Sequence, residues 1–322
     1  MNYVFGPVPS RRLGQSLGID TIPLKTCNWN CVYCQLGRTR PLATERKAYC
    51  PAEDIAAEVQ DVLAAHKPGE IDWVTFVGSG EPTLHTGIGW LIEQVKASTD
   101  IPVAVITNGS LLYQPDVRQA LITADAIMPT LDAGTPELHK QINRPHPMFT
   151  FDRLVEGMVQ LRRQYSGKLW VEVMLMAGLN DTEEALEQLA DVLRHVAPDE
   201  IHIGLPDRPP VEVWVKPADP DGVLRAAAIL GDVARVLTPI SGTFDLGGPG
   251  DPIEAVLRII TRHPMRQEQL EQALEQWRPG EVDQVLTELQ NSGRAQVVER
   301  QGVRFWSGAS ARFPTQRHNS TT

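Results

Sequence analysis

Over the first three quarters of the chain, the apolar positions switch between two spacings. Short, nearly continuous apolar runs predict buried strands, and apolar residues repeated every three or four positions predict amphipathic helices. Six strands are expected, at residues 15–21, 73–77, 103–107, 126–131, 169–176 and 200–205. Six helices follow them, at residues 53–65, 88–97, 116–123, 151–164, 182–195 and 224–237. Buried strands joined by helices predict an α/β fold with a parallel sheet, either an open doubly wound sheet or a partial barrel.

The pattern changes after the run LGGPGDP at 246–252, which is expected to be a linker between a domain at 1–245 and a smaller one. Beyond it, helices are expected at 253–261, 266–276 and 281–292, and two short strands at 296–300 and 303–307. Three helices and a hairpin resemble a winged helix, which predicts a small winged-helix-like domain at 253–312. The last residues, 313–322, are expected to form a disordered tail.

The composition of the chain limits which partners and which cellular location are expected. Apolar residues make up 42% of the chain, and 30 basic against 40 acidic residues give a net charge of −10. This charge argues against broad nonspecific binding to nucleic acid or anionic membranes. No apolar run approaches the roughly 18 residues of a membrane span, and the N-terminus lacks the apolar core of a signal peptide. We expect a cytoplasmic protein with no membrane partner, in which clustered cysteines serve a metal or redox role rather than a disulfide.

Three of the four cysteines lie in the run CNWNCVYC, as Cys27, Cys31 and Cys34, directly after the first predicted strand. Thiolates are soft ligands for iron–sulfur clusters and zinc. Structural zinc usually takes four protein ligands, whereas three thiolates on a [4Fe–4S] cluster leave one iron open for chemistry. Two alternatives stay open: a structural zinc site with Cys50 as fourth ligand, and burial of the thiols as small apolar side chains.

The cysteine run, with the aromatic Tyr33 before the last cysteine, resembles the signature of the radical S-adenosylmethionine (SAM) superfamily. The resemblance implies a (β/α)6 partial TIM barrel and a [4Fe–4S] cluster held by the three cysteines. It further implies that SAM chelates the fourth iron and is reductively cleaved, and that the resulting 5′-deoxyadenosyl radical abstracts hydrogen from a substrate. The stretch at 5–20 resembles radical SAM oxidoreductases of unknown activity that are related to wyosine-forming tRNA enzymes. Those tRNA enzymes carry further cysteines for a second cluster, whereas this chain has only Cys50 left, so a second cluster is not expected.

The run GSGEP after the second predicted strand matches a GGEP-like stretch of that family through Ser79, Gly80, Glu81 and Pro82. The resemblance implies that this stretch holds the amino group of SAM. A carboxylate and exposed carbonyls suit an ammonium group, and glycine permits close backbone approach. Taken alone, GSGEP also fits an ordinary strand-to-helix turn.

Polar residues also end the third and fourth predicted strands. The resemblance places Thr107 and Asn108 near the SAM carboxylate or ribose, and Asp132 at the ribose hydroxyls. An Asn-Gly turn and a helix N-cap are the respective structural alternatives. Asn143 and Arg144 follow in a loop on the same side, where they could bind the SAM carboxylate or an anionic substrate, or form a solvated loop. Arg11 and Arg12 could reach a substrate phosphate or carboxylate, or form a surface pair.

The charges of the C-terminal part argue against sequence-specific binding of DNA. Its third predicted helix is acidic, and acidic groups repel phosphates. The segment that follows has five arginines against one glutamate: Arg294, Arg300, Arg304, Arg312 and Arg317 against Glu299. We therefore expect a module that docks an RNA or protein partner. The favoured function is a radical SAM Fe–S oxidoreductase of unknown substrate, served by an electron donor such as ferredoxin or flavodoxin. The alternative is a metal- or Fe–S-dependent regulator that acts through the winged-helix module.

Overall fold

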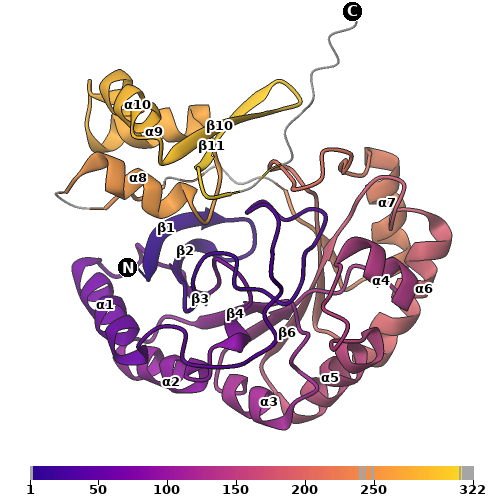
Figure 1. Cartoon of the computed structure of the whole chain (residues 1–322). Helices are drawn as coiled ribbons and strands as arrows, with labels where there is room; N and C mark the ends of the chain where they lie inside the picture. The colour runs from indigo at the N-terminus through magenta and orange to yellow at the C-terminus, as the bar shows by residue number, and fades with distance from the viewer. Residues whose placement is uncertain (1–2, 239–241, 243, 248–249, 312, 314–322) are drawn as a thin grey trace, which may run out of the picture.

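In the computed structural model, residues 3–238, 242, 244–247, 250–311 and 313 are described. Eight strands form one curled sheet whose spatial order is the chain order (Figure 1). The strands are β1 (Val4–Ser10), β2 (Gly14–Ile19), β3 (Trp73–Phe76), β4 (Val103–Thr107), β5 (Ala126–Pro129), β6 (Lys168–Met174), β7 (Glu200–Gly204) and β8 (Ala234–Val236). Only β1 and β2 pair antiparallel among them, and each later neighbouring pair is parallel. The predicted α/β partial barrel is confirmed.

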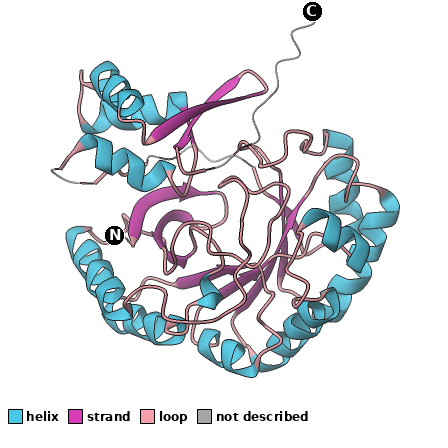
Figure 2. Cartoon of the chain, in the orientation of Figure 1, coloured by secondary structure: helices cyan, strands magenta, loops and turns pink. Residues whose placement is uncertain are grey.

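The helices that connect these strands lie along the outer, convex side of the sheet (Figures 1 and 2). They are α1 (Ala52–Ala65), α2 (Ile88–Ser98), α3 (Pro115–Leu121), α4 (Pro136–Ile142), α5 (Phe151–Gln164), α6 (Glu183–Val196) and α7 (Pro220–Leu230), with a short 3-10 helix η1 (Pro82–Leu84). Buried side chains of strands and helices form the main core between the two layers; they include Leu17, Val74, Val105, Ile127, Leu91, Leu161 and Leu189. Because side chains alternate along a strand, the positions between these face the inside of the half-barrel.

Two strands of the sheet differ from the expectation. β1 was not predicted, because its sequence VFGPVPS contains a glycine and two prolines, and its pairing with β2 is irregular between Phe5 and Val8. The helix expected at 224–237 ends at Leu230. There Gly231 adopts a φ of +80°, which a side chain disfavours, and the chain returns to the sheet as β8.

The C-terminal part contains α8 (Pro252–Ile260), β9 (Met265–Arg266), α9 (Gln267–Trp277), α10 (Val282–Asn291), β10 (Ala295–Arg300) and β11 (Val303–Gly308). Its three strands pair in the order β10–β11–β9. This arrangement is that of a winged helix, as predicted, with β9 as an additional short strand. The domain boundaries at 245 and 253 stay a prediction. Residues 248–249 of the predicted linker and all of the predicted tail except residue 313 lie outside the described residues.

A second core joins this C-terminal part to the barrel. Phe5 and Val8 of β1 pack with Val256 and Ile260 of α8, and Phe244 belongs to the same group. In Figure 1, α8 accordingly lies directly against the start of the sheet. β1 therefore packs on one side against the core of the barrel, through Val4, and on the other side against the C-terminal part, through Phe5 and Val8.

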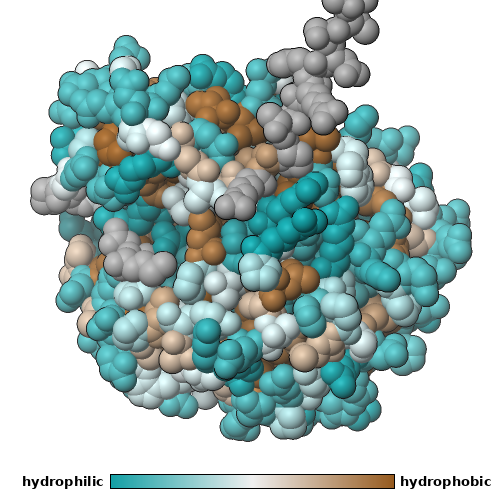
Figure 3. Space-filling model, viewed as in Figure 1, coloured by the Kyte–Doolittle hydropathy of each residue, from teal (hydrophilic) through white to brown (hydrophobic). Residues whose placement is uncertain are grey.

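Seen from the same side, the loops over the open centre of the half-barrel present mostly hydrophilic residues and a few hydrophobic ones (Figure 3). Among the described helices, none is both long enough and apolar enough to cross a membrane.

Candidate functional site

The three cysteines lie on the long loop between β2 and α1, at the carboxyl end of the sheet. This loop is tied down on two sides. Lys25 N donates to Ser79 O at 2.7 Å, at the end of β3, and Val32 N donates to Ile142 O at 2.9 Å, at the end of α4. The loop is thus fixed against elements that also carry predicted site residues.

Each cysteine sulfur accepts a hydrogen bond from a side-chain nitrogen. Cys27 Sγ lies 3.7 Å from Asn108 Nδ2, Cys31 Sγ lies 3.7 Å from Asn143 Nδ2, and Cys34 Sγ lies 3.2 Å from Lys25 Nζ. Burial raises the pKa of Cys27 to about 12, and nearby Glu81 adds to the effect. Burial, followed by the neighbouring thiols of Cys27 and Cys34, raises the pKa of Cys31 well above its ordinary value.

These sulfurs fit an iron–sulfur cluster better than they fit three free thiols. Closely spaced thiols need positive charge nearby to become thiolates, and iron ions supply that charge. No group of His, Cys, Asp or Glu in the described residues already surrounds a single metal-ion position. A four-iron cluster requires no such arrangement, because it binds each thiolate to a different iron. The fit therefore rests on the chemistry of the donors and their proximity.

Cys50 is separate from this set. It is buried in the main core, and its carbonyl oxygen accepts a hydrogen bond from His85 Nε2 at 2.8 Å. The thiols that shift the pKa of Cys31 are those of Cys27 and Cys34, and Cys50 is not among them. The structure therefore lends no support to Cys50 as a fourth ligand.

Glu81 joins the ends of two strands beside Cys27. Its buried carboxylate accepts hydrogen bonds from Thr107 Oγ1 at 2.6 Å, Asn108 N at 2.6 Å and Thr83 N at 3.0 Å. Burial raises the pKa of Glu81, and these hydrogen bonds oppose the rise. The carboxylate thereby holds the end of β3 against the end of β4. Its predicted contact with the SAM amino group stays a prediction.

The rest of the GSGEP turn lies against the cysteine loop. A Cβ at Gly80 would come within 1.9 Å of Thr26 O, the residue before Cys27, so the close approach requires glycine. Ser79 N donates to Asp20 Oδ1 at 3.2 Å, and Pro82 begins η1. The turn and the cysteine loop are therefore in close backbone contact at Gly80.

A second hydrogen-bonded group lies beside Cys31. The buried carboxylate of Asp132 accepts from Tyr33 Oη, Asn143 Nδ2 and Met174 N, each at 2.7 Å. Burial raises the pKa of Asp132 to about 6, and these donors oppose the rise. Asn143 Oδ1 lies 2.9 Å from His139 Nδ1. Because Asn143 Nδ2 already donates to Asp132, Oδ1 must accept, which assigns the proton of the neutral imidazole to Nδ1.

The loop after β7 closes the other side of the site. Arg144 Nη1 lies 2.6 Å from Glu212 Oε1, and Arg38 Nη2 lies 3.2 Å from the same oxygen. Glu212 N donates to Val32 O at 3.1 Å. Arg144 is thus held by an ion pair, although its side chain stays partly exposed.

The structure brings the predicted residues together in two neighbouring groups. Glu81, Thr107 and Asn108 lie beside Cys27, and Tyr33, Asp132 and Asn143 lie beside Cys31. Sequence reasoning missed Asn28 and Glu212. Asn28 is buried; its Nδ2 donates to Ser110 Oγ at 2.7 Å and its Oδ1 accepts from Asn108 Nδ2 at 2.6 Å. A polar residue inside the cysteine run was the available signal for Asn28, whereas no motif marks Glu212.

Replacing Tyr33 by phenylalanine tests the second group. At pH 7 the variant leaves the buried carboxylate of Asp132 without one of its three donors, so the free energy of unfolding should fall by about 1–2 kcal/mol. Urea unfolding measures this loss. Tyr49→Phe is the matched control, since the Tyr49 hydroxyl donates only to the exposed Glu45 carbonyl oxygen. An equal loss in both variants would contradict a special role for the Tyr33 hydroxyl.

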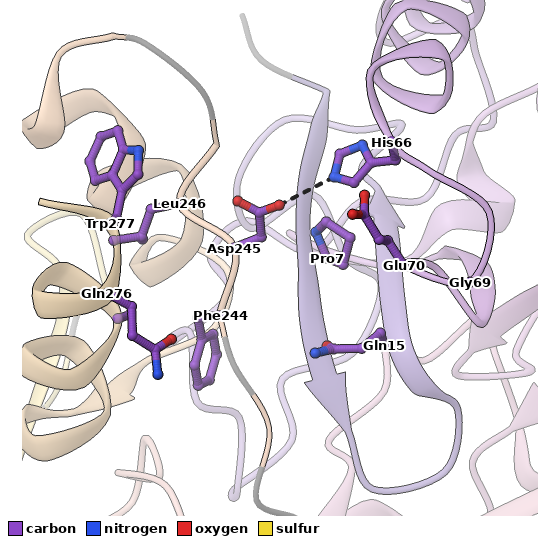
Figure 4. A pocket seen from close by; sticks show the side chains of 11 residues that line it. Pro7, Gln15, His66, Gly69, Glu70, Phe244, Asp245, Leu246, Gln276 and Trp277 are labelled. Atoms are coloured by element: carbon purple, nitrogen blue, oxygen red, sulfur yellow. Dashed lines mark hydrogen bonds and ion pairs between the residues drawn. The ribbon is translucent and has the colours of Figure 1, made fainter.

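The cavity of about 490 Å³ between the β1–β2 hairpin and the C-terminal part lies elsewhere (Figure 4). His66 Nε2 and Asp245 Oδ2 lie 3.3 Å apart within it, and Phe244 and Trp277 line its C-terminal side. None of the predicted site residues lines this cavity. Its size alone therefore does not mark it as the site of chemistry.

A family model described as the radical SAM superfamily matches residues 21–193, more than half of the chain. A UPF0026 protein of Methanocaldococcus jannaschii is 33% identical over 311 residues, which are 95% of this chain and 96% of that protein. The chain belongs to the radical SAM superfamily and to the UPF0026 family. Membership in the radical SAM superfamily implies a [4Fe–4S] cluster and SAM, to which the three thiols correspond.

Two further relatives are similar to parts of the chain. A UPF0026 protein of Synechocystis is 37% identical over 207 residues, 64% of this chain and 76% of that protein. A protein named GTPase Obg from Brachyspira hyodysenteriae is 44% identical over 200 residues, but the chain spans only 29% of its length.

Among solved structures, one reaches a TM-score that supports a likeness of fold. Streptococcus suis SuiB has a TM-score of 0.50 at 15% identity, over 76% of this chain and 52% of that chain. TYW1 with a lysine-pyruvate adduct bound has a TM-score of 0.46 at 13% identity, over 91% of this chain and 80% of that chain. At 15% identity, the likeness to SuiB concerns the fold alone.

Proposed function

We propose that this radical SAM protein is an Fe–S oxidoreductase that binds a [4Fe–4S] cluster through Cys27, Cys31 and Cys34 and starts radical chemistry on a substrate. When bound, the cluster and SAM would supply one-electron cleavage of SAM to methionine and a 5′-deoxyadenosyl radical, which takes a hydrogen atom from the substrate. The electron would come from a donor such as ferredoxin or flavodoxin. The observation that supports the proposal is the convergence of three hydrogen-bonded thiols on one anchored loop.

The surrounding residues have proposed roles that follow from their contacts. Asn108, Asn143 and Lys25 donate to the sulfurs, and such donors stabilise thiolates and tune a cluster. The turn Ser79–Gly80–Glu81–Pro82 would bind the SAM amino group, and Thr107 and Asn108 would lie near its carboxylate or ribose. The carboxylates of Glu81 and Asp132 already accept donors of their own chain, so contacts with SAM would use their remaining lone pairs.

Tyr33, Asp132 and Asn143 would form the ribose side of the SAM site. The hydrogen bonds among them hold Asp132 in place before SAM arrives, which reduces the cost of ordering the site on binding. Arg144 would face the SAM carboxylate or an anionic substrate. Since Arg144 is paired with Glu212, such a contact would be made by its remaining guanidinium N–H groups.

Anaerobic reconstitution tests the proposal. The full chain, treated with iron and sulfide, should bind about four irons and show the absorption of a [4Fe–4S] cluster. Addition of SAM and dithionite should then release 5′-deoxyadenosine, measured by chromatography. A fully loaded protein that releases none would contradict the proposed activity.

Docking of an RNA or protein partner by the C-terminal part is also a proposal. Two of its basic residues bond to the chain itself: Arg294 pairs with Glu254, and Arg300 Nη2 donates to Val215 O at 3.5 Å. Arg304 on β11 is exposed, while Arg312 and Arg317 lie outside the described residues. The alternative function, a metal-dependent regulator, needs a fourth protein ligand, and the position of Cys50 does not favour it.

A further inference from the structure

A cavity of about 150 Å³ lies inside the half-barrel, against the candidate site. Its sheet wall includes Ser16 and Thr75, whose hydroxyl oxygens lie 2.6 Å apart. Three further segments of the wall lie far apart in sequence: the turn between β1 and β2, the loop after β7, and the turn after α8. Each of these segments contributes arginine to the cavity, in the form of Arg11, Arg12, Arg208 and Arg262.

Three of these arginines face a carboxylate. Arg11 Nη1 lies 3.5 Å from Asp207 Oδ2, Arg12 pairs with Glu172, and Arg262 Nε lies 2.7 Å from Asp20 Oδ2. Arg11 and Arg12 are thus not a surface pair; they lie at the inner wall of the barrel.

Arg208 is different. Its Nη1 donates to Gln35 Oε1 at 3.1 Å, and its Nη2 lies 2.7 Å from His263 Nε2. Within the part of the chain that the structure describes, no carboxylate lies within ion-pair distance of Arg208. The pKa of His263 is well below its ordinary value, because of burial and then the charges of Arg208 and Arg11, so its ring is neutral and accepts from Arg208. Four guanidinium groups therefore share three carboxylates.

Burial and neighbouring charges both act on the pKa values of these arginines. Burial lowers the pKa of Arg208 to about 10; the charge of Asp207 opposes this shift and that of Arg11 adds to it. Burial, followed by the charges of Arg11 and Arg208, lowers the pKa of Arg12 to about 9. Cations that are desolvated and repel one another are stabilised by an anion between them. The planar, multiple N–H donors of arginine match a carboxylate or a phosphate.

The cavity adjoins the place of the proposed radical chemistry. Gln35, which lines it, directly follows Cys34, and Gly78, also in its wall, directly precedes Ser79. Asp20 links the two regions, since it accepts from Ser79 N and pairs with Arg262. A cavity of this volume, lined by arginines, suits a small anionic group.

We infer that this arginine-lined cavity binds the anionic end of the substrate, a carboxylate or a phosphate, with Arg208 as its central ligand. The C-terminal part completes the cavity: Arg262 forms part of its wall, and neutral His263 orients the guanidinium of Arg208. The inference rests on the proposed function only in treating the bound anion as part of the substrate.

Anion binding to the full chain, without SAM, tests the inference. Inorganic phosphate and malonate are titrated separately into the anaerobic protein at constant ionic strength, with heat of binding and unfolding temperature as readouts. At least one of them should bind saturably at one site per chain and raise the unfolding temperature, and the stronger of the two identifies the anionic group. Absence of saturable binding by either anion would overturn the inference.

Substitutions assign the site to Arg208. Arg208→Gln should weaken binding of the preferred anion at least tenfold, and Arg208→Lys, which keeps the charge but loses the planar donors, should weaken it several-fold. Arg194→Gln, on the exposed face of α6, is the control and should bind as the wild type does. If Arg208→Gln does not fold, the Lys variant decides. Wild-type affinity in the folded Arg208 variants would overturn the inference.

These readouts are independent of radical chemistry. A protein that binds the anion through Arg208 but releases no 5′-deoxyadenosine would contradict the proposed function alone. A protein that releases 5′-deoxyadenosine but binds the anion equally well without Arg208 would contradict this inference alone.

Discussion

Replacement of Cys31 by alanine is expected to reduce iron loading to below about a tenth of the wild-type value and to abolish release of 5′-deoxyadenosine. Cys31 is the central thiol of the three: the thiols of Cys27 and Cys34 both shift its pKa, and its sulfur accepts from Asn143. A cluster with only two thiolates lacks a ligand for a second iron and is lost in buffer. Iron and sulfide analysis after anaerobic reconstitution measures the effect.

Cys50→Ala provides the matched control within the same chain. Removing this buried thiol leaves a small cavity in the core, which should lower the free energy of unfolding by about 1–2 kcal/mol. Iron content and 5′-deoxyadenosine release should stay at the wild-type level. Loss of iron from the Cys50 variant would favour the metal-dependent regulator instead, because Cys50 would then be a fourth ligand beside the three clustered cysteines.

Gly80→Ala is expected to have the second-largest effect. The new Cβ would lie 1.9 Å from the carbonyl oxygen of Thr26, far inside contact distance, and both partners are backbone groups that cannot rotate away. Either the GSGEP turn or the loop that carries Cys27 must move. We expect the free energy of unfolding to fall by about 2 kcal/mol or more, and iron loading to fall at least several-fold.

Two measurements on the Gly80 variant separate stability from assembly of the site. Urea unfolding of the metal-free protein gives the stability, and iron analysis of the folded fraction gives the loading. Gly250→Ala is the control, because nothing lies within 4 Å of a Cβ built at Gly250. Wild-type stability and loading in Gly80→Ala would show that the loops do not approach as closely as described.

Periodicity predicted the six parallel strands that carry the site because buried parallel strands are continuous apolar runs, whose ends are marked by polar residues. Since those ends meet at one edge of the sheet, the residues from Glu81 to Asn143 could be assigned to one place from the sequence. β1 was not predicted, because its prolines and glycine interrupt the apolar pattern of a strand. β8 escaped because three residues after Gly231 are too short for a periodic signal.

The hydrogen bonds of the site could not be predicted in the same way. That Glu81 accepts from Thr107 and Asn108 depends on how far β3 and β4 are offset, which no local pattern encodes. The pairing of Arg144 with Glu212 joins residues 68 positions apart through a loop without regular structure. The cavity around Arg208 depends on the docking of the C-terminal part, to which the sequence gives no local signal.

The shared core of β1 and α8 limits which segments can be exchanged between related proteins in a chimera. Phe5 and Val8 each contribute about 1.5–3 kcal/mol by burial against α8, so a barrel that receives a foreign C-terminal part exposes this apolar surface unless the new α8 fits it. The first residues of the chain and its last 70 or so therefore have to change together, although more than 200 residues separate them. A chimera that exchanges β1 along with the C-terminal part should fold, whereas one that exchanges the C-terminal part alone should aggregate.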